Sequence, residues 1–258
     1  MTAIDPTSRF GERVDDYVKA RPSYPAELLD VLARECGLTK KSVVADLGSG
    51  TGIFTRLLLE SGATVYAVEP NDEMRGAAER DLASERLHSV RGRAEATTLP
   101  DASIDLATAA QAFHWFDVEA TRRELVRILR PDGFTALVWN DRDTKSTPFL
   151  RAFEALLVAH CPKYPELQGK ADAVSKFDAV FCKNGWQRYT LANRQDLTRD
   201  LLVARVMSAS YAPKQGTPEH AAIVAALDAL FAEHAGESDT VGIMYSTVVI
   251  TGRPRRDA

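Results

Sequence analysis

The sequence lacks an excess of basic residues, which is the usual mark of a protein that binds nucleic acid. Its 32 basic and 36 acidic residues give a formal net charge of −4 over 258 residues. The one basic cluster that stands out lies at residues 253–256. Such a chain has no general electrostatic field that attracts phosphate backbones, so we expect no nucleic acid substrate.

Cysteines and long apolar runs are also scarce. The three cysteines, Cys36, Cys161 and Cys182, lie far apart, without the C-x-x-C or Cys/His spacing of a metal site. No window approaches the ~20 apolar residues of a membrane span, and residues 1–10 carry no apolar signal core. We therefore expect a reduced, cytoplasmic protein without a structural metal or a membrane anchor.

The hydrophobic content is what allows a substantial core. Hydrophobic residues make up 45% of the chain, which suffices for one large core or for one core with a small cap. No internal repeat, low-complexity tract or long linker divides the sequence. We therefore predict one domain over residues 1–258, with an insertion.

A glycine-rich turn between an apolar run and a helical run is the most informative pattern. Residues 43–52 read VVADLGSGTG, and a second apolar run at 65–68 ends in Glu69. Glycine permits positive φ angles and lets a ligand lie against the backbone. Glu69 follows the turn by about 20 residues, the separation at which nucleoside-binding βαβ units place a carboxylate on the ribose. The alternating glycines differ from the G-x-G-x-x-G of dinucleotide sites.

A run of aromatic residues follows the predicted strand 104–109. Residues 110–117 read AQAFHWFD, and the carboxyl edge of an open α/β sheet is where ligands bind. His114 can accept a proton from an acceptor, because the unperturbed pKa of histidine is about 6.5. It can equally be a hydrogen-bonding wall residue. An aromatic face, such as that of Trp115, favours a nearby positive charge.

Alternating strand and helix patterns predict a doubly wound, mostly parallel α/β sheet. The predicted strands are 43–47, 65–68, 88–90, 104–109, 134–139, 187–192 and 241–251. The predicted helices are 8–20, 25–36 and 53–59, two that begin after Asn71 and Asp117, and then 147–161, 197–207 and 217–235. The stretch 163–185 is predicted to be irregular. An insertion after the fifth strand lies near the ligand edge, so we predict a lid over the acceptor site at 141–185.

Three strings resemble known methyltransferases. DLGSGTG at residues 46–52 resembles the first motif of class I S-adenosylmethionine-dependent methyltransferases. RVDDYVKARPSYP at 13–25 and AFHWFD at 112–117 resemble the trans-aconitate methyltransferase-like small-molecule group. The resemblance implies a Rossmann-like sheet of seven strands, whose last strand is antiparallel and inserted between the fifth and sixth. It also implies S-adenosylmethionine as methyl donor, S-adenosylhomocysteine as product, and a small-molecule acceptor with a carboxylate or hydroxyl oxygen.

The resemblance further implies a helical cover over the cofactor site at residues 1–38 and a set of contact residues. The implied cofactor contacts are Tyr17, Arg21, Asp46, Gly48, Ser49, Gly50, Glu69, Pro70, Ala94, Glu95 and Gln111. The implied acceptor contacts are His114, Trp115, Ser210 and Tyr211. Structural alternatives stay open for several of these residues: a core aromatic for Tyr17, a solvated helix end for Arg21, a loop acid for Glu95, and a capped helix end for Ser210 and Tyr211.

Other functions also stay open. The acceptor can be a quinone-like or other apolar metabolite. A nicotinamide-dependent oxidoreductase would fit the βαβ pattern, but it predicts G-x-G-x-x-G and a pair such as Tyr-x-x-x-Lys, neither of which stands at the expected place. A catalytically silent cofactor-binding protein is the third alternative, because residues 141–185 hold no motif that names an acceptor.

Overall fold

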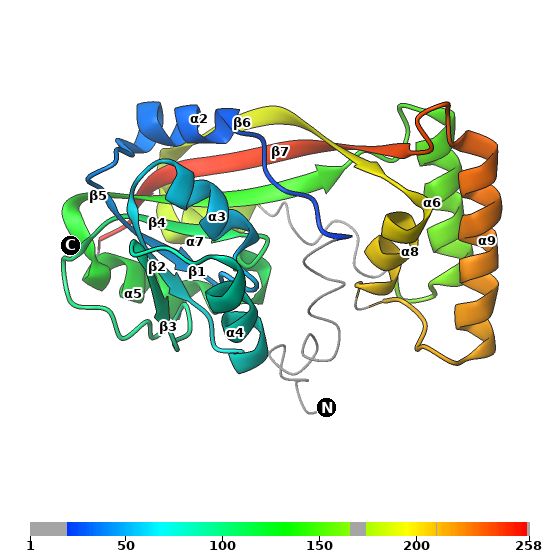
Figure 1. Ribbon diagram of the computed structural model, residues 1–258. Coiled ribbons are helices and arrows are strands. Elements are labelled where there is room, and N and C mark those ends of the chain that lie inside the picture. Colours follow the sequence, from blue (N-terminus) through cyan, green and yellow to red (C-terminus); the bar gives the residue numbers. More distant parts are fainter. Residues whose placement is uncertain (1–19, 166–173, 210, 257–258) are drawn as a thin grey trace.

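The computed structural model describes residues 20–165, 174–209 and 211–256. Its seven strands form one sheet in the order β3-β2-β1-β4-β5-β7-β6. Strands β1 to β5 run parallel, and β7 lies antiparallel between β5 and β6 (Figure 1). The predicted seven-stranded α/β fold with an inserted antiparallel last strand is thereby confirmed.

The elements alternate as predicted through the first half of the chain. The strands are β1 Val43–Leu47, β2 Thr64–Val68, β3 Leu87–Val90, β4 Ile104–Ala110, β5 Leu129–Arg142, β6 Phe181–Leu197 and β7 Val241–Pro254. The helices are α2 Glu27–Cys36, α3 Ile53–Glu60, α4 Asp72–Asp81, α5 Val118–Ile128, α6 Pro148–His160, α7 Val174–Val180, α8 Arg199–Met207 and α9 Pro218–His234. A 3-10 turn, η3, spans Phe113–Trp115.

Several helices begin at the residues that the sequence marks as caps. The Asn71 side chain accepts hydrogen bonds from two backbone N–H groups in the first turn of α4. Asp117 and Thr147 each accept one such bond, at the starts of α5 and α6. These bonds satisfy N–H groups that a helix leaves without an internal partner, so the starts of these helices follow from local sequence.

Two expectations about the second half were wrong. β6 spans Phe181–Leu197 instead of 187–192, and the stretch predicted to be irregular contains α7. β6 is an edge strand of the sheet, so its exposed residues are mostly polar and its apolar pattern is short. α7 has only seven residues, too few for a helical period to be recognised, although Phe177 and Val180 are fully buried.

The predicted turn at residues 130–133 lies inside β5. Leu129 pairs with Ile104, and the next pair joins Phe134 to Leu106, so the intervening residues interrupt the ladder with β4. The residues predicted to form a turn are therefore a bulge within the strand, which begins before them.

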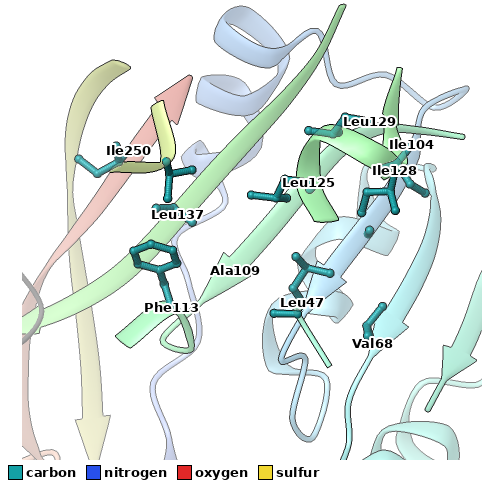
Figure 2. Packing of buried hydrophobic residues seen from close by; sticks show 14 of the residues in the cluster. Leu47, Val68, Ile104, Ala109, Phe113, Leu125, Ile128, Leu129, Leu137 and Ile250 are labelled. Atoms are coloured by element: carbon teal, nitrogen blue, oxygen red, sulfur yellow. The ribbon is translucent and has the colours of Figure 1, made fainter. Parts of the chain in front are cut away.

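Helices cover both faces of the sheet. On one face, Leu125 and Ile128 of α5 pack near Ile104 and Leu129 (Figure 2), and α7 packs beside α5. The other face is covered by α2 and α3 in a second buried cluster. Within the predicted cover at 1–38, α2 thus lies on the sheet face over β5, β7 and β6, and residues 1–19 lie outside the described residues.

A third cluster forms what we call the helical lobe, made of α6, α8 and α9 (Figure 1). Ala110, the last residue of β4, pairs with Val138, and β5 continues to Arg142. β7 and β6 accompany it, because Arg142 pairs with Tyr245 and Tyr245 with Asn193. This three-stranded ribbon carries the helical lobe beyond the carboxyl edge of β1, β2 and β4.

The helical lobe draws on more of the chain than the predicted lid at 141–185. It includes α8 and α9, which follow that range, whereas α7 within the range packs against α5. The role of residues 141–185 at the acceptor site stays a prediction. Within the described ranges, no helix has the length and apolar character needed to cross a membrane.

Candidate functional site

The turn between β1 and α3 depends on glycine at two positions for different reasons. Gly48 has φ 65°, and a Cβ added there would lie 2.8 Å from the Cβ of Ala112. Gly50 has φ 57°, and a Cβ there would meet only the sulfur of Met74, at 3.9 Å. Gly48 is thus required for close packing against the loop after β4. Gly50 is required for its backbone conformation, and a Cβ there would have no close neighbour.

Glu69 lies at the end of β2 and holds this turn in place. Its Oε2 accepts a hydrogen bond from the N–H of Gly50 at 2.9 Å, and its Oε1 accepts one from the N–H of Asn71 at 2.8 Å. The residue is only 6% exposed. Burial raises the pKa of this carboxyl, whereas the two N–H donors act in the opposite direction. Glu69 and Gly50, predicted from separate motifs, are therefore in direct contact.

Asp46 is directed into the protein. Its two carboxylate oxygens accept hydrogen bonds from the hydroxyls of Thr55 at 2.6 Å and Thr108 at 2.9 Å. Burial raises the pKa of Asp46 to about 6, which the two hydroxyls oppose and nearby Glu69 increases. These bonds join β1 to α3 and β4, so Asp46 positions the glycine turn. Its predicted contact with a cofactor stays a prediction.

The residues at 111–116, which we call the aromatic loop, follow β4. Gln111 has φ 56°, a left-handed conformation that is uncommon without glycine and that concentrates at functional sites. Its N–H donates to Val138 O at 2.8 Å. Phe113 is buried against Phe116 and Trp139. A Cβ at Gly48 would lie 3.3 Å from the Phe116 ring, so the aromatic loop packs directly on the glycine turn.

His114 and Trp115 face away from that core. Their rings lie 4.8 Å apart, and Trp115 is 43% exposed. His114 is exposed as well. These two side chains are therefore the most exposed of the aromatic run.

Glu95 has a role that the sequence did not indicate. Its Oε1 accepts a hydrogen bond from the N–H of Asp117 at 2.9 Å, and its Oε2 lies 3.7 Å from Nε of Arg93. The neighbouring Ala94 is buried. Glu95 thus ties the loop after β3 to the end of the aromatic loop, at the start of α5. No sequence signal pairs these two residues.

Four other predicted residues lie toward the helical lobe or outside the described ranges. Arg21 donates through Nη2 to Ser208 O, at the end of α8, at 3.2 Å. Tyr211 packs edge-on against Tyr164, with ring centroids 5.0 Å apart. Tyr17 and Ser210 lie outside the described residues. In the part of the chain that the structure describes, no three His, Cys, Asp or Glu side chains come together as a metal site.

Comparison with known proteins places this arrangement in a family. The family model described as "Methyltransferase domain" matches residues 45–137. This range contains β2 to β4, parts of β1 and β5, the glycine turn, Glu69 and the aromatic loop. Residues 45–137 are a methyltransferase domain. This identification confirms the predicted family, and the trans-aconitate-like subgroup stays a prediction.

The chain is also similar to curated proteins that are named methyltransferases. An uncharacterized methyltransferase of Mycobacterium tuberculosis is 40% identical over 141 residues, which are 55% of this chain and 56% of that protein. An uncharacterized methyltransferase-like protein of Schizosaccharomyces pombe is 36% identical over 152 residues, 57% of each chain. The chain thus spans a little over half the length of the curated relatives that it matches.

Solved structures support the fold of the methyltransferase domain and its extension. A protein of Anaeromyxobacter dehalogenans, provisionally named a type II methyltransferase, superposes with a TM-score of 0.67 at 24% identity. The match covers 90% of this chain and 97% of that chain. At this identity the likeness concerns the fold, and it includes the region of the helical lobe as well as the sheet.

Proposed function

We propose that the protein transfers a methyl group from S-adenosylmethionine to a small-molecule acceptor and releases S-adenosylhomocysteine. The observation that carries this proposal is the contact between Gly50 and Glu69. It combines a glycine turn after β1, which is open at Gly50, with a buried carboxylate after β2. In nucleoside-binding βαβ units, this carboxylate binds the ribose hydroxyls.

The residues at the carboxyl edge fit such a cofactor. Each Glu69 oxygen has one N–H donor, and a carboxylate oxygen can accept more than one hydrogen bond, so it can also bind a ribose hydroxyl. The other proposed contacts follow the ends of neighbouring parallel strands. They are Ser49 after β1, Pro70 after β2, Ala94 and Glu95 after β3, and Gln111 after β4. The exposed aromatic surface of Trp115 suits a cationic sulfonium.

The protein's part in the reaction is mainly positioning. When bound, S-adenosylmethionine supplies a methyl group that is already electrophilic. The chain then has to hold the acceptor in line with it, with reacting atoms about 3 to 3.5 Å apart, and to exclude water. We assign the acceptor side to His114, Trp115 and Tyr211, with Ser210 as the neighbouring candidate. His114 and Trp115 belong to the methyltransferase domain, and Tyr211 to the helical lobe.

An oxygen acceptor, either a carboxylate or a hydroxyl, remains our first choice. With a hydroxyl acceptor His114 can take the proton, whereas a carboxylate acceptor needs no base. The exposed Trp115 ring favours one alternative, a quinone-like or other apolar acceptor, because it can stack on a flat ring.

Calorimetry with S-adenosylhomocysteine and with NADH tests the cofactor assignment on the full chain. We expect binding of S-adenosylhomocysteine and none of NADH. The reverse result would overturn the proposal in favour of an oxidoreductase. Transfer of labelled methyl groups to a panel of small carboxylic acids, phenols and amines then tests catalysis. Cofactor binding without transfer to any of them would favour a catalytically silent protein.

A further inference from the structure

Asn140 lies where β5 leaves the sheet, and it connects four separate parts of the chain. Its Nδ2 donates to Ser23 O at 3.1 Å. Its Oδ1 accepts from Thr247 Oγ1 at 2.6 Å and from Asn193 Nδ2 at 3.2 Å. Its backbone carbonyl accepts from Gln111 Nε2 at 3.3 Å. These partners come from the segment before α2, from β7, from β6 and from the aromatic loop.

The segment Ala20–Tyr24, which we call the strap, is held across the ribbon by amide side chains. Asn193 also donates to Ser23 O, at 2.8 Å, so this carbonyl accepts from two amides. Gln195 donates through Nε2 to Ala20 O at 3.1 Å. Three side chains from β5 and β6 therefore bind the strap through its backbone.

The strap contacts both parts of the molecule. At one end, Arg21 donates to Ser208 O at the end of α8, in the helical lobe. At the other end, the Tyr24 ring packs edge-on against Phe54 of α3, with centroids 4.9 Å apart. α3 is the helix that begins at the glycine turn. The strap therefore joins the proposed acceptor side to the proposed cofactor side.

We propose that Asn140 is a positioning residue for methyl transfer. It couples the strap to the aromatic loop and so fixes the position of the acceptor side relative to the cofactor side. Asparagine suits this position because it offers a donor and an acceptor at the same side-chain end. The reaction needs this relative position, because a misplacement of the reacting groups by about 1 Å can slow the reaction on the order of 100-fold. The catalytic part of this inference rests on the proposed function, whereas the coupling does not.

The coupling is tested by hydrogen exchange of the aromatic loop in the full chain. Gln111, Trp115 and Phe116 donate backbone hydrogen bonds, so their amides report on the order of the loop. Asn140→Asp keeps the side-chain shape, removes the donor to Ser23 O and places a carboxylate against that carbonyl. We expect exchange of these amides to accelerate about tenfold or more. Among the described residues, Asn193 is linked to the loop through Asn140, so Asn193→Asp should accelerate this exchange at least about threefold.

Ser246→Ala is the matched control, because Ser246 is an exposed residue next to Thr247 on the same strand. It should leave exchange of the loop unchanged. Acceleration confined to β6 in Asn193→Asp, with the loop unaffected, would overturn the coupling. If Asn140→Asp does not fold, the edge-strand variant Asn193→Asp decides the question alone.

The positioning role is tested by separating binding from turnover. For Asn193→Asp, we expect the dissociation constant of S-adenosylhomocysteine to stay within about twofold of the unsubstituted protein. The kcat for an acceptor found active in the methyl-transfer panel should fall about tenfold. An equal kcat would overturn the positioning role. If the unsubstituted protein does not bind S-adenosylhomocysteine, the proposed function fails, while the exchange experiment still decides the coupling.

Discussion

Glu69 and Gly50 are joined by a hydrogen bond of 2.9 Å between a carboxylate oxygen and a backbone N–H. The bond connects the end of β2 to the turn after β1, and the second carboxylate oxygen holds the N–H of Asn71, the cap of α4. One buried acid thus fixes two backbone segments beside the proposed cofactor. Both donors come from the backbone, and each carboxylate oxygen can accept a further hydrogen bond from a ribose hydroxyl.

Substituting Glu69 tests this double role. We expect Glu69→Ala to weaken binding of S-adenosylhomocysteine by about 1.5 to 3 kcal/mol, the usual size for hydrogen bonds to a charged group. Calorimetry measures the change. Glu73→Ala, which removes an exposed acid in the first turn of α4, should leave the affinity unchanged. Unchanged binding in Glu69→Ala would remove this residue from the ribose.

Gly50 and Gly37 allow backbone strain to be separated from loss of binding. Both have positive φ, 57° and 70°, so Val at either position costs stability, on the order of 1 to 2 kcal/mol. Gly37 ends α2, with nothing within 4 Å of an added Cβ. We expect Gly50→Val to abolish binding of S-adenosylhomocysteine while the fold survives, and Gly37→Val to retain it. Calorimetry and thermal unfolding of both variants make the comparison. Normal binding in Gly50→Val would show that the turn does not touch the ligand.

Those parts of the site that depend on local sequence could be predicted. The glycines indicate a turn because its backbone conformation is strained for other residues. Asn71 indicates a cap because a helical pattern begins directly after it. Glu69 is placed by the length of one helix and one strand. Each of these features is set by residues close in the chain, so their geometry appears in the order of residue types.

The contacts between distant segments could not be predicted. Asp46 belongs to a motif associated with a cofactor, yet its oxygens bind Thr55 and Thr108. Glu95 binds the N–H of Asp117 across a whole strand. The helical lobe is carried by β5, β6 and β7, which continue past the end of β4. The sequence of β5 does not indicate that it extends further than β4. Polar edge strands add to this difficulty, because their apolar pattern is short.

The ionisation of Asp46 should make the stability of the fold depend on pH. Its folded pKa of about 6 lies above the ordinary value of 3.8, because burial penalises the charge. Folding therefore favours the protonated acid. This contribution is full below about pH 4 and is lost as the pH rises through about 6, with a size of about 3 kcal/mol.

Asp46→Asn tests this prediction, because the amide imitates the neutral acid and both threonine hydroxyls can accept as well as donate. As the pH rises from 4 to 7, the unsubstituted protein should lose about 3 kcal/mol of stability at this site, and the variant should not. The difference in the free energy of unfolding, variant minus unsubstituted protein, should therefore increase by about 3 kcal/mol. Urea unfolding at the two pH values measures it. Thr55→Val removes a donor to the ionised acid and should cost more at pH 7 than at pH 4. Parallel pH dependences in all three proteins would contradict the assignment.

His114 decides whether the protein uses a general base. It is exposed on η3 and lies against Trp115, which suits a wall residue beside the acceptor. A carboxylate acceptor needs no deprotonation, so we expect His114→Ala to lower kcat/KM while the acid limb of the pH-rate profile persists. The measurement is kcat/KM from about pH 5 to about pH 9, which includes the range in which histidine titrates. His88→Ala, at an exposed histidine that stacks on Tyr66, is the matched control and should change neither. A flattened acid limb in His114→Ala alone would assign His114 as the base and would point to a hydroxyl acceptor.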